Sequence, residues 1–106
     1  MITAGVDVGA ATAKTVIVAD GEILSWAVIP TGDSVARAAE RVTETALELA
    51  KLSRADLQFV ISTGYGRNGV TAANKAASEI ICHARGVNLL IPAVRTVIDI
   101  GGQDSK

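Results

Sequence analysis

Aromatic side chains are scarce in this 106-residue chain, which holds one tryptophan, one phenylalanine and one tyrosine. Hydrophobic residues still make up 49% of it, so we expect a core built from alanine, valine, isoleucine and leucine. The length suits one domain, and the composition is that of an ordinary globular protein. A domain of this size buries only about 60–70% of the surface that its unfolded chain exposes, so we expect a narrow stability margin.

The chain also has almost no net charge and only one cysteine. Ten basic and eleven acidic residues give a formal net charge of −1, which offers no electrostatic footprint for nucleic acid or for an anionic membrane. No apolar run reaches the roughly 18 residues that span a bilayer, and the N-terminus has no signal-peptide pattern. The single cysteine, Cys82, cannot form an internal disulfide, which fits a cytoplasmic location. We therefore expect a cytoplasmic protein that binds neither nucleic acid nor a membrane.

The spacing of apolar residues predicts alternating strands and helices. Strands are expected at residues 2–8, 15–19, 22–29, 57–63 and 95–100, and helices at residues 34–52 and 74–85. Asp20-Gly21 is a strong hairpin signal, and Gly86 is expected to end the second helix. The order β-β-β-α-β-α-β predicts an α/β fold of the ribonuclease H-like type, with a mixed five-stranded sheet and helices on its faces.

Two segments, residues 5–9 and 97–102, share a pattern that points to nucleotide binding. Each is an apolar strand with one carboxylate near its end, Asp7 or Asp99, followed by glycine. A carboxylate in an apolar strand is costly unless it has a partner, and a hydrated divalent cation is one such partner. Glycines after the strand let backbone N–H groups approach a phosphate closely. We interpret the pair as two loops that grip one Mg–nucleotide. Two tight turns, each with a locally satisfied Asp, are the alternative.

Residues 10–14 extend the first loop. Its small residues keep the turn open, and Thr12 and Lys14 could donate hydrogen bonds to phosphate oxygens. Lys14 could equally be an ordinary solvent-exposed strand residue. The sequence contains no G-x-x-x-x-G-K-[ST] motif, which excludes a P-loop, and no G-x-G-x-x-G motif, which disfavours a Rossmann dinucleotide site.

Two further clusters follow. The segment Ser-Thr-Gly-Tyr-Gly-Arg-Asn-Gly at residues 62–69 comes after a strand, where α/β sheets place their ligand sites. Its tyrosine and arginine between glycines favour a functional or inter-subunit loop over a plain solvent loop. In the second cluster, Glu79 and His83 share a helix face, with Cys82 beside them. These neighbours are too few for a metal site, so we expect a hydrogen-bonded histidine and a packed cysteine.

Together the motifs resemble one family. They are Gly-Val-Asp-Val-Gly at 5–9 with Lys14, Ser-Thr-Gly-Tyr-Gly-Arg-Asn at 62–68, Ser-Glu-Ile-x-Cys-His-Ala-x-Gly at 78–86 and Val-Ile-Asp-Ile-Gly-Gly-Gln-Asp-x-Lys at 97–106. The first and last are typical of the wider actin, sugar-kinase and heat-shock-chaperone superfamily. The middle two narrow the resemblance to the BadF/BadG/BcrA/BcrD-type ATPases, which include 2-hydroxyglutaryl-CoA dehydratase activators and benzoyl-CoA reductase ATPase subunits.

The resemblance implies a homodimer, or a pair of related subunits, with an acetate-kinase-like two-domain fold. It implies ATP hydrolysis that drives a low-potential electron from an iron–sulfur cluster at the dimer interface to a partner acyl-CoA dehydratase or reductase. Residues 1–106 would form the N-terminal ribonuclease H-like subdomain, with the second domain absent. The cluster cysteines of the family lie downstream, so we do not expect this chain to hold the cluster, and we expect it to be inactive alone.

The resemblance also implies roles for individual residues. Asp7 and Asp99 would be catalytic and would hold Mg²⁺ through water or orient the attacking water. Backbone amides after Gly9 and Gly101 would stabilise charge on the transferring phosphoryl group. The residues expected to bind ATP or ADP are Gly9, Ala10, Thr12, Ala13, Lys14, Gly101, Gly102 and Gln103. Two alternatives remain open: a fragment of a sugar or carboxylate kinase of the same superfamily, and a non-catalytic assembly module.

Overall fold

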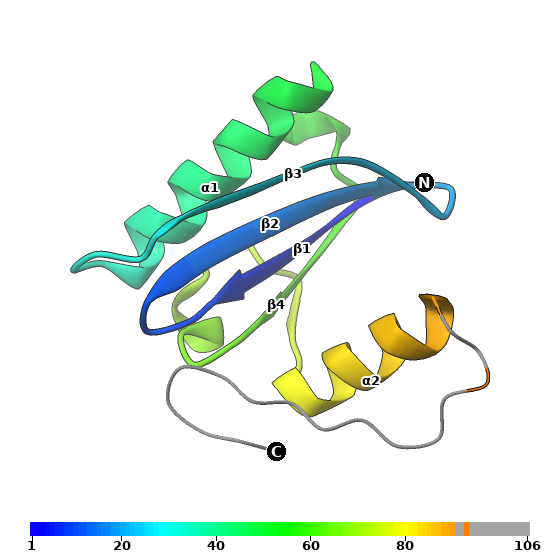
Figure 1. Ribbon diagram of the computed structural model, residues 1–106. Coiled ribbons are helices and arrows are strands. Elements are labelled where there is room, and N and C mark those ends of the chain that lie inside the picture. Colours follow the sequence, from blue (N-terminus) through cyan, green and yellow to red (C-terminus); the bar gives the residue numbers. More distant parts are fainter. Residues whose placement is uncertain (91–92, 94–106) are drawn as a thin grey trace.

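The body of the protein is a mixed five-stranded sheet with one long helix across a face (Figure 1). The computed structural model describes residues 1–90 and residue 93. The strands are β1 (Ile2–Val8), β2 (Thr12–Ala19), β3 (Glu22–Pro30), β4 (Phe59–Thr63) and β5 (Lys75–Ala76), and the helices are α1 (Val35–Ala50) and α2 (Glu79–Leu90). The spatial order is β3-β2-β1-β4-β5. This sheet with its helices confirms the α/β fold class predicted from the sequence.

The first three strands form an antiparallel meander. β1 pairs with β2 and β2 with β3, both antiparallel, while β4 runs parallel to β1. Asp20 and Gly21 join β2 to β3 with φ angles of 50° and 83°. Positive φ at both central residues is the signature of a type I′ turn, which matches the twist of the strands on either side. The hairpin signal read from Asp20-Gly21 is therefore confirmed.

The core lies between α1 and one face of the sheet. Alternate residues of the strands point toward α1 and form that face. Small aliphatic residues dominate this core, among them Val6, Val8, Ile17 and Val42, each buried to 1% exposure or less. The whole set is Ala4, Val6, Val8, Ala13, Ile17, Ala27, Ala38, Ala39, Val42, Ala46, Leu47, Val60 and Val70. No aromatic residue belongs to it among the described residues, as the composition predicts.

Helix α1 covers this core because its apolar residues recur on one side. Ser34 caps its N-terminus, where the side-chain oxygen accepts a hydrogen bond from the Arg37 amide at 3.2 Å. Lys51 ends it in the left-handed region, with φ of 59°. The observed helix is slightly shorter than the predicted residues 34–52, because capping residues stand at both ends.

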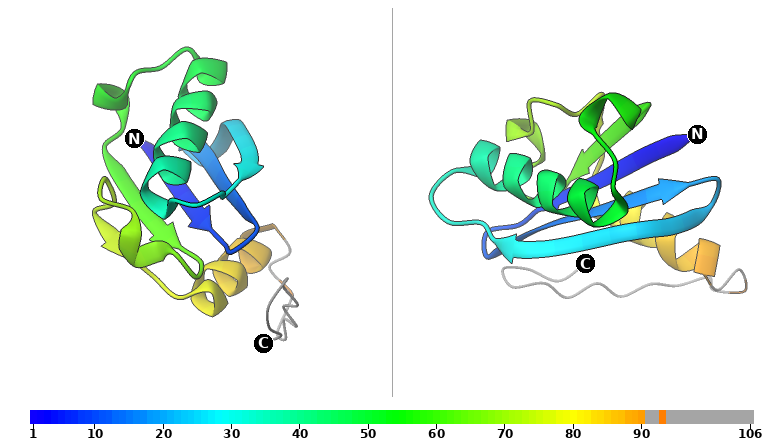
Figure 2. Two further views of the ribbon diagram at one scale, coloured as in Figure 1. Left: turned by 90° about the vertical axis from the view of Figure 1, so that its left-hand side faces the viewer. Right: turned by 90° about the horizontal axis from the view of Figure 1, so that it is seen from above.

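The other face of the sheet carries alternate residues that point away from α1. Helix α2 lies on this side of the sheet (Figures 1 and 2). Large apolar side chains nevertheless stay exposed on this side, including Trp26 at 65% and Val28 at 51%. We call this side the open face. Asp7 and Lys14 also lie on it, because they alternate with the buried residues of β1 and β2.

The segment around β5 differs from the prediction. A helix was expected from residue 74, but residues 74–77 run beside β4: the Asn74 amide donates to the Val60 carbonyl at 2.8 Å, and the Ala77 amide to the Ser62 carbonyl at 2.9 Å. Helix α2 therefore begins later, at Glu79, and it continues through Gly86 to Leu90. The strand predicted at residues 95–100 lies outside the described residues. No helix in the described part of the chain is long and apolar enough to cross a membrane.

Candidate nucleotide site at the carboxyl ends of β1 and β4

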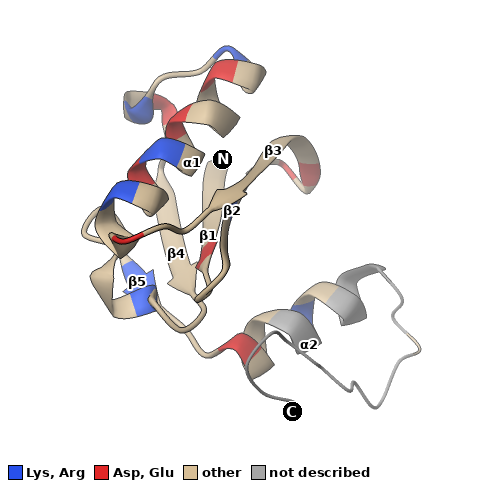
Figure 3. Cartoon of the chain, turned by 60° about the vertical axis from the view of Figure 1, so that its left-hand side comes forward, with Lys and Arg blue, Asp and Glu red and all other residues tan. Residues whose placement is uncertain are grey.

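Asp7 lies near the end of β1 on the open face, and its side chain is 30% exposed. Its partner across the antiparallel β1–β2 pair is Lys14. The Lys14 ammonium, on a side chain 40% exposed, lies 3.6 Å from Asp7 Oδ2 and donates to the Thr12 carbonyl at 3.3 Å. Lys14 is thus a strand residue whose charge is held beside Asp7. Charged residues lie mostly on α1 and the loops, with few on the strands (Figure 3).

The loop between β1 and β2 is anchored through its carbonyl groups. The Gly9 amide donates to the Thr12 carbonyl at 2.9 Å, and Thr31 donates to the Gly9 carbonyl through its hydroxyl at 2.8 Å and to the Ala11 carbonyl through its amide at 3.0 Å. Within the described residues, the amides of Ala10 and Ala11 have no acceptor, and both residues are exposed. A loop in which the Gly9, Ala11 and Thr12 carbonyls are bonded and two amides are free is suited to binding an anion.

Ala13 does not face this loop. Its side chain is fully buried in the core on the α1 side, so only its backbone belongs to the site predicted from the sequence. Asp99, Gly101, Gly102 and Gln103, the predicted second loop, lie outside the described residues.

The end of β4 closes tightly on Asp7. Gly64 follows β4 with φ of +90°, and a Cβ placed there would overlap Asp7 Oδ1 and lie 2.5 Å from the Val8 carbonyl oxygen. A residue with a side chain could not hold this position without displacing the carboxylate. Gly64 therefore fixes the chain directly against Asp7, a contact that the sequence motifs did not reveal.

Thr63, just before Gly64, pairs with Asp7 in the parallel β1–β4 register. It is 9% exposed, and its Oγ1 is a buried side-chain oxygen without a hydrogen-bond partner in the part of the chain that the structure describes. Sequence reasoning missed Thr63 as a neighbour of Asp7. The strand assignments for residues 2–8 and 57–63, aligned at their carboxyl ends, were the signal that could have found it.

Gly66 and Gly69, which follow Thr63 in the loop, lie where close packing leaves no room for a side chain. The Gly66 amide donates to the Val8 carbonyl at 2.8 Å, and a Cβ on Gly66 or Gly69 would come within 2.9 Å of Val35 at the start of α1. Arg67 Nη1 donates to the Gly64 carbonyl at 3.1 Å and lies 3.8 Å from Glu79 Oε1. The loop therefore joins β1, α1 and α2 together, while Tyr65 projects outward at 76% exposure.

Cys82 is the one cysteine of the chain. This cysteine is half-buried, and no group of three or more His, Cys, Asp or Glu residues occurs in the described ranges. A four-iron cluster is held by several cysteine thiolates, whereas the chain has one cysteine. The residues of this chain do not fit such a cluster.

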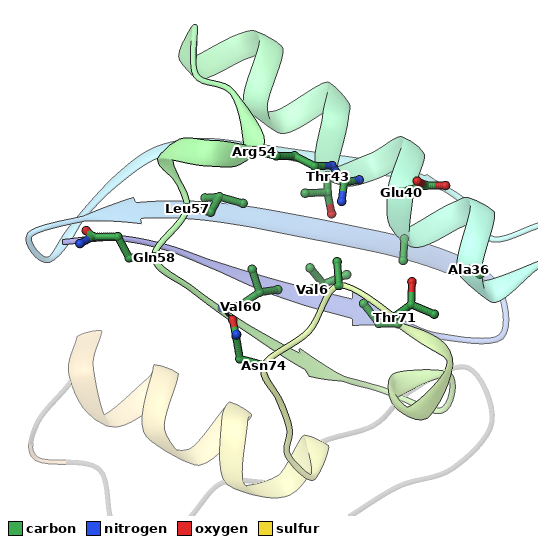
Figure 4. A pocket seen from close by; sticks show the side chains of 13 residues that line it. Val6, Ala36, Glu40, Thr43, Arg54, Leu57, Gln58, Val60, Thr71 and Asn74 are labelled. Carbon is green, nitrogen blue, oxygen red and sulfur yellow. Dashed lines mark hydrogen bonds between the residues drawn. The ribbon is translucent and has the colours of Figure 1, made fainter.

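A separate pocket of about 250 Å³ opens on the α1 side of the sheet (Figure 4). Val6 and Val60 contribute to its floor, Thr43 lines it from α1 and Asn74 from the segment before β5. Since Asp7 and Lys14 point to the opposite face, this pocket is distinct from the site at the strand ends.

Comparison with known proteins identifies the family. Residues 4–106 match the BadF/BadG/BcrA/BcrD ATPase family. The chain is 43% identical over its whole length to an activator of lactoyl-CoA dehydratase from Anaerotignum propionicum and covers 41% of that protein. It is 45% identical to a 2-hydroxyisocaproyl-CoA dehydratase activator from Clostridioides difficile, of which it covers 40%.

Two solved structures share the fold. The crystal structure of component A of (R)-2-hydroxyglutaryl-CoA dehydratase from Acidaminococcus fermentans superposes with a TM-score of 0.92 at 40% identity, over 99% of this chain and 41% of that one. The activator of the 2-hydroxyisocaproyl-CoA dehydratase from Clostridium difficile, with bound ADPNP, gives a TM-score of 0.90 at 42% identity, over 99% of this chain and 39% of that one. The chain spans about 40% of the length of its relatives. It belongs to the BadF/BadG/BcrA/BcrD ATPase family.

Proposed function

We propose that this chain is the N-terminal nucleotide-binding part of an ATPase that couples ATP hydrolysis to low-potential electron transfer into an acyl-CoA dehydratase or benzoyl-CoA reductase. The observation that carries the proposal is the arrangement at the strand ends. Asp7 and Lys14 lie side by side, next to a loop whose Ala10 and Ala11 amides have no acceptor among the described residues. A similar protein with bound ADPNP supports it.

The residues present fit a phosphate group together with a hydrated Mg²⁺ ion. The free amides of the first loop would donate hydrogen bonds to phosphate oxygens, and Lys14 would add a positive charge. Asp7 would accept hydrogen bonds from water on the metal, and its 30% exposure leaves room for that water. When bound, Mg²⁺ neutralises charge on the phosphates. In this proposal Asp99, Gly101, Gly102 and Gln103 supply the second loop.

The partner and assembly are part of the same proposal. The relatives are named as activators of dehydratases, so we infer a partner of the acyl-CoA dehydratase or reductase class and a second copy or related ATPase subunit. Residues 1–106 would form one subdomain of a two-domain protein, a proposal that the 40% coverage of the relative supports, and we propose a cytoplasmic location for it. We assign no electron-transfer step to this chain, because its residues do not fit the iron–sulfur cluster.

The test is calorimetric titration of this chain with ADP and Mg²⁺. Asp7→Asn removes the charge while keeping the shape, and we expect it to weaken Mg–ADP binding by at least about 10-fold, or about 1.4 kcal/mol. Glu44→Gln, the same change of charge on an exposed position of α1, is the matched control and should bind as the parent does. Equal affinity in parent and Asp7→Asn would rule out the proposed role of Asp7, and no binding by the parent would rule out nucleotide binding by this chain.

A further inference from the structure

The buried hydroxyl of Thr63 stands apart from the other buried hydroxyl groups of the described chain. The others all have partners: Thr15 and Thr43 bond to each other at 3.0 Å, Ser25 donates to the Ala46 carbonyl, Thr31 to the Gly9 carbonyl and Ser62 to the Arg67 carbonyl. Among the side chains that the structure describes, Thr63 Oγ1 alone is a buried side-chain oxygen without one. Such exceptions call for a specific explanation, because a hydroxyl loses its water on burial and regains nothing.

The position of Thr63 indicates what its hydroxyl faces. Thr63 and Asp7 are paired residues on parallel strands, so their side chains leave the sheet on the same side. Asp7 Oδ1 lies against Gly64, and Oδ2 lies 3.6 Å from the Lys14 ammonium. The carboxylate is thus held in place without a hydrogen bond from Thr63, and two polar groups with free capacity lie next to each other.

We propose that Thr63 is a positioning residue of the nucleotide site, whose hydroxyl has no partner in the nucleotide-free chain and shares one water molecule with the Asp7 carboxylate once Mg–nucleotide is bound. The water would donate one hydrogen bond to Asp7 and take part in a second with Thr63 Oγ1, which can donate or accept. A bound water needs between about two and four polar partners, and a phosphate oxygen or the metal supplies the next. This inference rests on the proposed nucleotide-binding function and adds a residue to it.

The substitution Thr63→Val tests the inference, because valine has the same shape and lacks the hydroxyl. Removing an unpaired buried hydroxyl should stabilise the chain, so we expect the Tm without nucleotide to rise by a few degrees, up to about 4–8 °C. The dissociation constant for Mg–ADP should increase by roughly 2- to 10-fold, the value of one hydrogen bond. Thr63→Ser keeps a hydroxyl and should restore most of the affinity.

Thr15→Val is the matched control, since it makes the same change at a buried residue of β2 that faces α1. It leaves the Thr43 hydroxyl without its partner, so the Tm should fall, while Mg–ADP affinity should stay at the parent value. A fall in Tm for Thr63→Val would show that the hydroxyl has a structural partner and would overturn the inference. So would parent-like Mg–ADP affinity in that variant. If the parent itself fails to bind Mg–ADP, the proposed function falls and this inference falls with it, a result distinct from the other two.

Discussion

Gly64 is the residue on which the geometry around Asp7 depends most directly. Its φ of +90° is a conformation that residues with a side chain rarely adopt, and its α-carbon faces both the Asp7 carboxylate and the Val8 carbonyl. Two separate constraints, backbone conformation and close approach, thus require glycine at one position. The site and the stability of the fold are therefore coupled here.

Gly64→Ala should accordingly destabilise the protein and weaken the site together. Backbone strain alone costs about 1–3 kcal/mol, and displacement of Asp7 adds to it. We expect a lower urea midpoint and weaker Mg–ADP binding. Gly86→Ala is the control: a Cβ there meets nothing within 4 Å, and alanine in a helix should stabilise by about 0.5–1 kcal/mol. Equal stability of the parent and Gly64→Ala would contradict the contact with Asp7.

The residues of the site were only partly predictable from the sequence. Asp7, Gly9 and Lys14 belong to a contiguous motif, so a local pattern pointed to them. That Lys14 faces Asp7 depends on the β1–β2 register, and that Thr63 and Gly64 adjoin Asp7 depends on the parallel pairing of β1 with β4. These contacts join strands distant in the chain, which no motif records.

At the scale of elements, the β2–β3 hairpin is the clearest example of local specification. Asp20 and Gly21 both have positive φ, and the N-terminal ammonium of Met1 donates to Asp20 Oδ1 at 2.8 Å. That hydrogen bond, with the positive charge of the ammonium, lowers the pKa of the Asp20 carboxyl below 3.8. The turn conformation and the ion pair are separable, because asparagine also tolerates positive φ.

Gly21→Ala should destabilise the protein by about 1 kcal/mol, because alanine at φ of 83° is strained. A lower urea midpoint than that of the parent is the expected measurement.

Asp20→Asn should keep the turn and lose only the ion pair, a small effect because Asp20 is fully exposed. A lowered folded-state pKa means that the ion pair stabilises above pH 3.8 and is lost as the pH falls further. Urea unfolding at several pH values should therefore show parent and Asp20→Asn converging below pH 3.8. A difference that grows there would contradict this.

The segment of residues 74–78 shows why local patterns mispredict some elements. Its alanines fit a helical stripe, yet the Asn74 side chain accepts a hydrogen bond from the Val60 amide at 2.7 Å and the backbone pairs with β4. Tertiary pairing outweighs a weak local helical preference. Strands β1 and β3 and helix α1 were predictable because their periodic patterns are long and their ends carry turn or cap residues.

For the molecule as a whole, the main feature is that one face of the sheet is covered and the other, the open face, keeps apolar side chains exposed. Helix α1 buries one face of the sheet, while Ile23, Trp26 and Val28 on β3 remain more than half exposed. Exposed apolar patches mark surfaces that contact something else. The sequence predicted the fold class, because the order of its elements allows few topologies. It could not predict which face would stay open, since that depends on how α2 lies.

Trp26 is the sole tryptophan of the chain and can report on this face directly. At 65% exposure its fluorescence should resemble that of tryptophan in water, and acrylamide should quench it nearly as well in the native chain as in the urea-unfolded chain. A blue-shifted, protected tryptophan would contradict the exposure. If Trp26 is protected from quenching, dilution shows what covers it. Protection that is lost on dilution means that a second copy covers β3, and protection that persists means that the same chain covers it. Trp26→Phe gives the background signal and confirms that the emission belongs to this position.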